Sequence, residues 1–170
     1  VGVSCVNALS VYLKATVYNQ GKIYEQEYSC CFPKGPVKEI GTTDKTGTEI
    51  TFLPDDTIFT TTEYKYHILE ARLRDLSYLN KGIKLVLIDK REKDEKGNYL
   101  YQKEFYSQEG LKEFVQYLDQ SREKLIEDII YLDTEKNGTP VEFAMQYNTS
   151  FTENVHSYVN NINTIDGGTH

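Results

Sequence analysis

Side chains over residues 11–29 alternate between apolar and polar in a way that only a few folds can accommodate. The segments "VYLKATVY" and "KIYEQEYS" each alternate with a period of two, and "NQGK" between them contains Gly21. A period of two indicates a strand, and glycine supplies the backbone freedom that a tight turn requires. We therefore predict an antiparallel hairpin, then a loop over "CCFPKGPVKEIG" and a further strand over "GTEITFLP".

Three segments favour helices. "VGVSCVNALS" predicts a short helix of small and apolar residues at the start of the chain. In "TTTEYKYHILEARLRDLSYLNKG", Thr60 and Glu63 have the spacing of a capping box, and Gly82 suits a helix end. Leucines recur in that segment at helical spacing (Leu69, Leu73, Leu76). "EGLKEFVQYLDQ" places four apolar side chains on one helical face (Leu111, Phe114, Val115, Leu118).

Strand patterns continue between and after these helices. "IKLVLID" and "YLYQKEF" flank a charged turn, and further strands are expected near Ile129–Asp133, Thr139–Tyr147 and Asn154–Asn160. A charged stretch over residues 121–128 breaks the periodicity and suggests a boundary. Strands and helices mix without a regular βαβ rhythm, so we expect an α+β fold with mainly antiparallel sheet.

Composition narrows the function classes. The formal net charge is −7, which argues against a surface organised mainly around nucleic acid, because neutralising phosphates requires clustered Lys and Arg. No apolar run approaches the ~20 residues of a membrane span. Three cysteines (Cys5, Cys30, Cys31) lack CxxC spacing and are expected to be reduced thiols. A cytoplasmic location is expected.

The residue types common in catalytic and metal sites do not form a motif here. His67, His156 and His170 lack HxH or HxxxH spacing, so no metal site is expected. The carboxylate pairs Asp55–Asp56 and Glu127–Asp128 lie in polar connections, where turn and surface roles are favoured. The same turn chemistry explains the Asn-x-Thr/Ser segments at two asparagines (Asn137, Asn148).

Two glycine-containing segments remain as candidate binding elements. Gly2 precedes the first helix, whose free N–H groups favour an anion. Gly47 precedes a strand and is flanked by Thr46 and Thr48, whose hydroxyls can bond a polar ligand, although a simple turn is the favoured reading. The opening "VGV" and the closing "IDGGTH" both suggest a chain that is part of something longer.

Four segments in order carry a family resemblance: "VGVSCVNALS", "TDKTGTEITFLPD", "LEARLRDLSYLNKGIKLVLIDKR" and "NNINTIDGGTH". Together they resemble the ATPase subunit of bacterial type IIA topoisomerases, on the side of the DNA gyrase B family rather than topoisomerase IV. The resemblance covers the chain from its first residue to its last.

The resemblance implies nucleotide-binding roles for five residues. "VGV" matches the end of a glycine-rich lid whose amides hold the nucleotide phosphates, so Val1, Gly2 and Val3 are expected to contact ATP. Thr48 matches a threonine in the network of water and carboxylate that reads the adenine amino group. Ile50 matches an apolar wall of the same pocket.

The resemblance also shows which chemical groups are missing. Members of the family use a glutamate as general base, an asparagine as Mg²⁺ ligand, an aspartate that recognises adenine, and a lysine in a QTK loop; none of these motifs occurs here. No catalytic residue and no metal ligand is therefore assigned. Because activating a water requires a positioned base, we expect this chain alone not to hydrolyse ATP.

The implied architecture has two parts. Residues 1–120 would be the C-terminal part of a GHKL-type ATP-binding sandwich, and residues 121–170 the first strands of a transducer domain with a ribosomal-protein-like βαβ fold. The resemblance implies that the parent protein uses ATP and Mg²⁺ for negative supercoiling of DNA, together with gyrase A in an A2B2 complex. Two alternatives stay open: a topoisomerase IV B protein, or a free-standing interaction domain without nucleotide chemistry.

Overall fold

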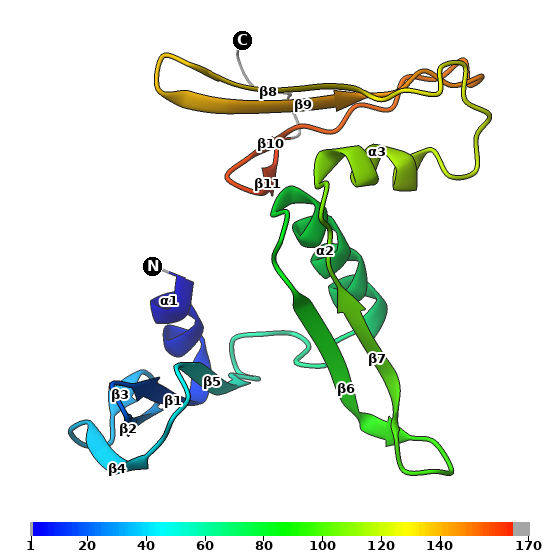
Figure 1. Cartoon of the computed structure of the whole chain (residues 1–170). Helices are drawn as coiled ribbons and strands as arrows, with labels where there is room; N and C mark the ends of the chain where they lie inside the picture. Colours follow the sequence, from blue (N-terminus) through cyan, green and yellow to red (C-terminus); the bar gives the residue numbers. More distant parts are fainter. Residues whose placement is uncertain (1, 165–170) are drawn as a thin grey trace. The chain divides into compact units, whose positions relative to one another are not determined.

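The computed structural model describes residues 2–164 and divides the chain into two compact units, residues 1–64 and 65–170. Figure 1 labels the elements of both. The expectations for Val1, His170 and the "DGGTH" ending fall outside the described residues. Every paired strand among the described residues is antiparallel, which confirms the predicted α+β class with mainly antiparallel sheet.

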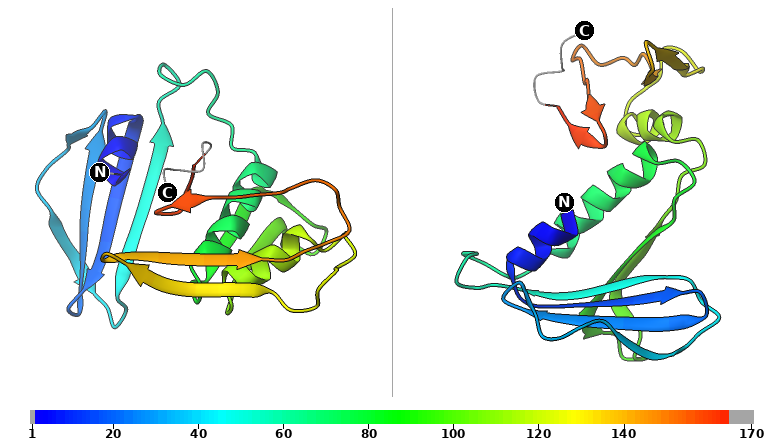
Figure 2. Two further views of the ribbon diagram at one scale, coloured as in Figure 1. Left: turned by 90° about the horizontal axis from the view of Figure 1, so that it is seen from above. Right: turned by 90° about the vertical axis from the view of Figure 1, so that its left-hand side faces the viewer.

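The first unit is a helix and one sheet. Its elements are α1 (Gly2–Ala8), β1 (Ser10–Asn19), β2 (Lys22–Ser29), β3 (Phe32–Pro33), β4 (Lys38–Thr42) and β5 (Gly47–Pro54). The sheet has the order β3-β2-β1-β5, and β4 also pairs with β2. Figure 2 shows β1 beside β5, with α1 on one side of the strands.

The predicted hairpin and the strand that ends at Pro54 are confirmed. Gln20 and Gly21 form the turn with φ of 50° and 78°, the left-handed pair that a two-residue hairpin requires. Residues 30–41, which follow the hairpin, were predicted as a loop, and this prediction is wrong in part. Both β3 and β4 form in this segment, because the free edge of β2 offers backbone partners such as Lys22 for Thr42.

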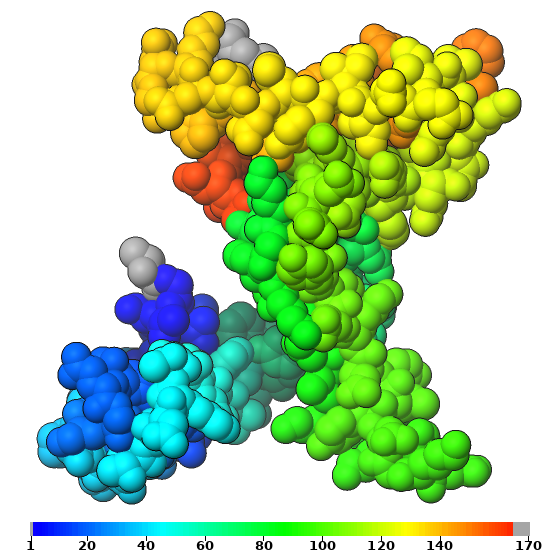
Figure 3. All heavy atoms as spheres, in the orientation of Figure 1, coloured from blue at the N-terminus to red at the C-terminus, as the bar shows by residue number. Residues whose placement is uncertain are grey.

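The second unit alternates helices with hairpins. Its elements are α2 (Tyr66–Leu79), β6 (Leu85–Lys93), β7 (Tyr99–Phe105), α3 (Leu111–Leu118), β8 (Ile130–Lys136), β9 (Thr139–Met145), β10 (Tyr158–Val159) and β11 (Ile162–Asn163). Three two-stranded sheets result: β6–β7, β8–β9 and β10–β11. The space-filling view shows the yellow and orange β8–β9 hairpin over α3, with which β9 is in contact (Figure 3).

The predicted start of the long helix is wrong. Helix α2 begins at Tyr66, and its N-cap residue Lys65 makes no side-chain capping hydrogen bond. The N–H of Glu63 donates instead to the hydroxyl of Thr61 at 3.3 Å, a local turn that competes with a helical N-terminus. The β-branched threonines before it are weak helix formers. The predicted exit is confirmed, since Gly82 lies just beyond the helix with a φ of 83°.

The last predicted strand is also wrong. Residues 154–157 are not in a strand, and Asn160 and Asn161 form a turn with φ of 49° and 65° between the short strands β10 and β11. Asparagine tolerates the left-handed region better than most residues, so the pair favours a turn over a continuing strand. By contrast, the predicted turn at Asn137 and Gly138 is confirmed between β8 and β9.

Aromatic rings form the centre of the second unit. Phe114 of α3 is 5% exposed and stacks on Tyr78 of α2, with ring centroids 5.1 Å apart. The ring of Tyr158, in β10, lies 6.3 Å from the Phe114 ring. This cluster joins the two helices to the β10–β11 hairpin, which Arg72 also holds by donating to the carbonyl of Asn161 at 2.8 Å.

A polar cluster closes the C-terminal end of α3. Asp119 is 6% exposed, and the amide nitrogen of Asn148 donates to both of its carboxylate oxygens at 3.0 Å. The Asn148 side-chain oxygen accepts from the N–H of Ser150 at 2.8 Å. This asparagine therefore has the turn role that the sequence predicts.

Candidate functional site

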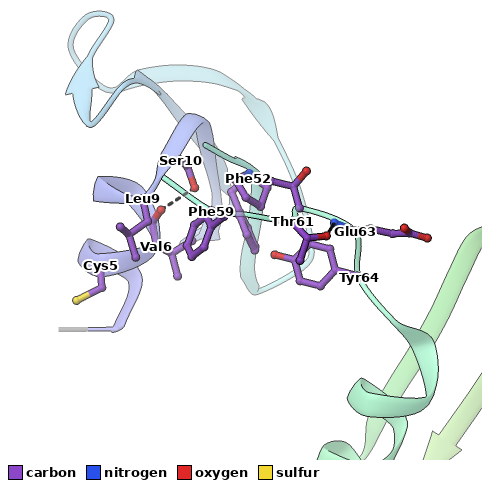
Figure 4. A pocket seen from close by; sticks show the side chains of 11 residues that line it. Cys5, Val6, Leu9, Ser10, Phe52, Phe59, Thr61, Glu63 and Tyr64 are labelled. Carbon is purple, nitrogen blue, oxygen red and sulfur yellow. Dashed lines mark hydrogen bonds between the residues drawn. The ribbon is translucent and has the colours of Figure 1, made fainter. Parts of the chain in front are cut away.

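The first unit contains an apolar cavity between α1 and the sheet. Its volume is about 350 Å³. Cys5, Val6 and Leu9 line it from α1 and the residue after it, and Phe52 and Pro54 line it from β5. The segment after β5 completes the wall (Phe59, Thr61, Thr62, Glu63, Tyr64), as Figure 4 shows for the labelled side chains.

Strand alternation places the predicted threonine and its neighbour on the same face. Successive side chains of a strand point to opposite faces, so Thr48 and Ile50 share the face of Phe52 and Pro54. On β1, their antiparallel partners are Val17 for Thr48 and Ala15 for Ile50. The face that carries the candidate adenine-contacting residues is therefore the one that α1 meets.

The candidate phosphate-binding residues lie on α1. Gly2 begins this helix and is exposed, and a Cβ placed on it would meet no atom within 4 Å. Val3 is also exposed. The backbone at Gly2 is thus open to close approach by a ligand. The structure brings Thr48 and Ile50 together on one strand, and it places Gly2 and Val3 on the helix that packs on the same sheet.

The cavity residues were not singled out from sequence. The alternation that runs from Thr48 to Pro54 is the signal that finds Phe52, since it is two residues beyond Ile50. No comparable signal marks Phe59 or Tyr64, because they lie in an irregular segment where periodicity gives no direction.

Polar groups around the cavity are engaged in local structure. The hydroxyl of Ser10 donates to the carbonyl of Val6 at 2.6 Å and links β1 to α1. Just after β5, Asp55 accepts from the hydroxyl and the N–H of Thr57, at 2.6 and 2.9 Å. These bonds hold the pKa of the Asp55 carboxyl below its ordinary value, which supports the predicted turn role of this carboxylate.

Side chains that could bind a metal ion do not cluster in the part of the chain that the structure describes. Over residues 2–164, no group of three or more His, Cys, Asp or Glu side chains is placed to hold a metal ion. His156 lies instead near an aromatic ring, with its centroid 6.2 Å from that of Phe114. Within the same residues, no helix is long and apolar enough to cross a membrane.

Comparisons with known proteins point to one family. The family model described as DNA gyrase B matches residues 110–170. The DNA gyrase B of Cytophaga hutchinsonii is 58% identical over all 170 residues, which cover 35% of that protein. The 43K ATPase domain of Thermus thermophilus gyrase B, solved in complex with an aminocoumarin, has a TM-score of 0.84 and 28% identity, covering 95% of this chain and 43% of that one.

A protein of the paralogous family is also similar, at lower identity than the Cytophaga hutchinsonii protein. The B protein of DNA topoisomerase 4 from Enterococcus faecalis is 45% identical over 172 residues, covering the whole of this chain and 24% of that protein. The fold and the match along the full chain define the class as the B proteins of type II topoisomerases. Within that class, the chain belongs to the DNA gyrase B family. It spans about a third of the length of the Cytophaga hutchinsonii relative.

Proposed function

We propose that this chain is the part of a DNA gyrase B protein that completes the ATP-binding sandwich and begins the transducer domain. The 58% identity to a DNA gyrase B over every residue carries this proposal. We place the boundary between the two parts near residue 120. The start of the family-model match at residue 110 supports a change of domain in this region.

We assign ATP contacts to Val1, Gly2, Val3, Thr48 and Ile50. In this assignment the amides around Gly2 bind phosphate oxygens, because exposed N–H groups at a helix start carry partial positive charge. The Thr48 hydroxyl reads the adenine edge through water, and Ile50 contributes an apolar wall. Their shared face with Phe52 supports the placement of the base over β5.

We further propose that the chain needs groups outside itself for catalysis. The glutamate base, the asparagine ligand of Mg²⁺ and the QTK lysine of the family match no motif in this sequence. When bound, Mg²⁺ neutralises charge on the phosphates, and the residues of this chain contribute binding and orientation. The 170-residue chain alone therefore shows no ATP turnover above background.

The parent activity we propose is ATP-dependent negative supercoiling of DNA in the cytoplasm, in an A2B2 complex with gyrase A. The net charge of −7 fits a chain that does not itself bind DNA tightly. The 45% identity to a topoisomerase 4 B protein keeps decatenation as the alternative activity. Supercoiling and decatenation assays of the parent protein with its partner separate the two.

Thr48→Ala in the parent protein tests the site. Loss of a hydrogen bond in a polar network costs about 1.5 kcal/mol, so kcat/KM for ATP should fall roughly tenfold and selectivity over GTP should weaken. Thr51→Ala is the matched control, because Thr51 lies on the same strand with its side chain on the opposite face. Equal effects of the two substitutions contradict the assignment. Turnover by the isolated 170-residue chain contradicts the proposed dependence on outside groups.

A further inference from the structure

Two adjacent cysteines form the tip of the hairpin between β2 and β3. Ser29 pairs with Phe32, so Cys30 and Cys31 are the two residues of the turn. Their φ angles are 47° and 67°. Both side chains are exposed and both thiols are free.

Cysteine is an unusual choice for this turn. Two consecutive left-handed residues favour Asn-Gly, the type of pair found at Asn137 and Gly138 in the other unit. A residue with a Cβ and no local hydrogen-bonding group is strained in the left-handed region. Residues held in such conformations cluster at functional sites, so the pair Cys30–Cys31 is a candidate for one.

The surrounding structure holds the backbone of both cysteines. The N–H of Cys30 donates to the carbonyl of Val11 in β1 at 3.1 Å. The carbonyl of Cys31 accepts from the side-chain amide of Asn7 in α1 at 3.3 Å. The two thiols are therefore carried on a fixed turn rather than on a flexible loop, and less conformational freedom is lost when one ligand binds both.

The spacing of the two residues disfavours a direct disulfide. Disulfides join Cα atoms that are usually 4.4–6.8 Å apart, whereas consecutive Cα atoms across a trans peptide are about 3.8 Å apart. A direct bond between the two sulfurs would close a small ring through the backbone. A single larger atom placed between the sulfurs enlarges that ring by one member and relieves this constraint. Thiolates are soft ligands and select soft centres.

We propose that Cys30 and Cys31 form a chelating dithiol site for trivalent arsenicals. With phenylarsine oxide as the probe, two As–S bonds replace the bonds from arsenic to oxygen. The two thiol protons leave with that oxygen as one water molecule, and arsenic stays trivalent. The site does not rest on the proposed nucleotide-binding function, because it lies at the hairpin tip and uses none of the five residues assigned to ATP.

The test measures phenylarsine oxide binding to the 170-residue chain. Intact mass spectrometry should show one phenylarsenic per chain with loss of two hydrogens, and titration of free thiols should fall from three to one. An excess of a monothiol should leave the adduct in place, while a dithiol should remove it. Cys30→Ser and Cys31→Ser should each weaken retention on the order of 100-fold, because the second bond is lost.

Cys5→Ser is the matched control, since Cys5 is also free and exposed but has no cysteine next to it in the sequence. It should retain the adduct fully. Equal losses in Cys5→Ser and Cys30→Ser overturn the proposal, as does an adduct that a monothiol removes. A peptide of residues 28–33 supplies the unfolded reference and should bind several-fold more weakly. Equal binding by the peptide overturns the role given to the fixed turn.

Discussion

Replacing Asn148 by alanine tests the polar cluster at the end of α3. The side-chain amide of Asn148 donates to both oxygens of Asp119, and Asp119 is 6% exposed. The substitution leaves a buried carboxylate that keeps its ion pair to Arg122 at 3.5 Å. It also removes the turn bond from the N–H of Ser150.

The magnitude follows from these bonds. A hydrogen bond to a charged group contributes about 1.5–3 kcal/mol. The two contacts from one amide nitrogen count as about one such bond, and the turn bond adds about 0.5–1 kcal/mol. Part of the loss is offset by water entering the space of the removed side chain. We therefore expect Asn148→Ala to lower the free energy of unfolding by about 2–3 kcal/mol.

Urea unfolding followed by near-ultraviolet circular dichroism suits this chain, because it has 14 tyrosines and no tryptophan. Asn154→Ala is the matched control, since Asn154 is exposed and outside any strand, and it should cost less than about 0.5 kcal/mol. The exchange Asp119→Asn with Asn148→Asp should recover part of the loss by restoring one carboxylate–amide pair. A value for Asn148→Ala within about 0.5 kcal/mol of the control would show that the Asn148 side chain does not stabilise this cluster.

Two further predictions concern packing and pH. Leu13→Ala should cost about 2–5 kcal/mol in urea unfolding, because Leu13 is 2% exposed, whereas Leu53→Ala at 57% exposure should cost far less; similar costs would argue against the burial pattern. The hydroxyl of Tyr131 donates to Glu142 at 2.8 Å, and this bond, with burial, raises the pKa of Tyr131 to about 12. Because the pKa is above its ordinary value of 10.0, the contribution to stability is complete below pH 10 and is lost as the pH rises through about 12. Tyr131→Phe should remove the corresponding late step from a spectrophotometric tyrosine titration, and an unchanged titration would contradict the assignment.

The elements that sequence predicted well are those with a strong period or a specific turn pair. The alternation before and after Gly21, the strand ending at Pro54 and the turn at Asn137 all follow from local chemistry. Local chemistry also misled. The spacing of Thr60 and Glu63 suits a capping box, but the N–H of Glu63 bonds the hydroxyl of Thr61 in a local turn, and the helix begins only at Tyr66.

The features that the sequence did not predict depend on contacts with segments that are distant in the sequence. Strand β4 forms because β2 has a free edge, and no local pattern within residues 38–42 indicates this pairing. The position of Phe59 in the cavity wall could not be predicted for the same reason, because it depends on where an irregular segment lies relative to α1. For the candidate site, the resemblance supplied Gly2, Thr48 and Ile50, and the strand period supplied their shared face.

The strand pairs of the first unit differ in the length of chain that separates the two strands, and this difference bears on the order of folding. In the first unit, β1 and β2 each pair with the next strand along the chain across a two-residue turn, so the β1–β2 and β2–β3 hairpins close short loops. The β1–β5 pair instead joins segments separated by β2, β3 and β4. Because long loops cost more entropy before contacts form, docking of β5 on β1 should be the late kinetic step of the first unit. The face that carries Thr48 would then be among the last surfaces of that unit to assemble.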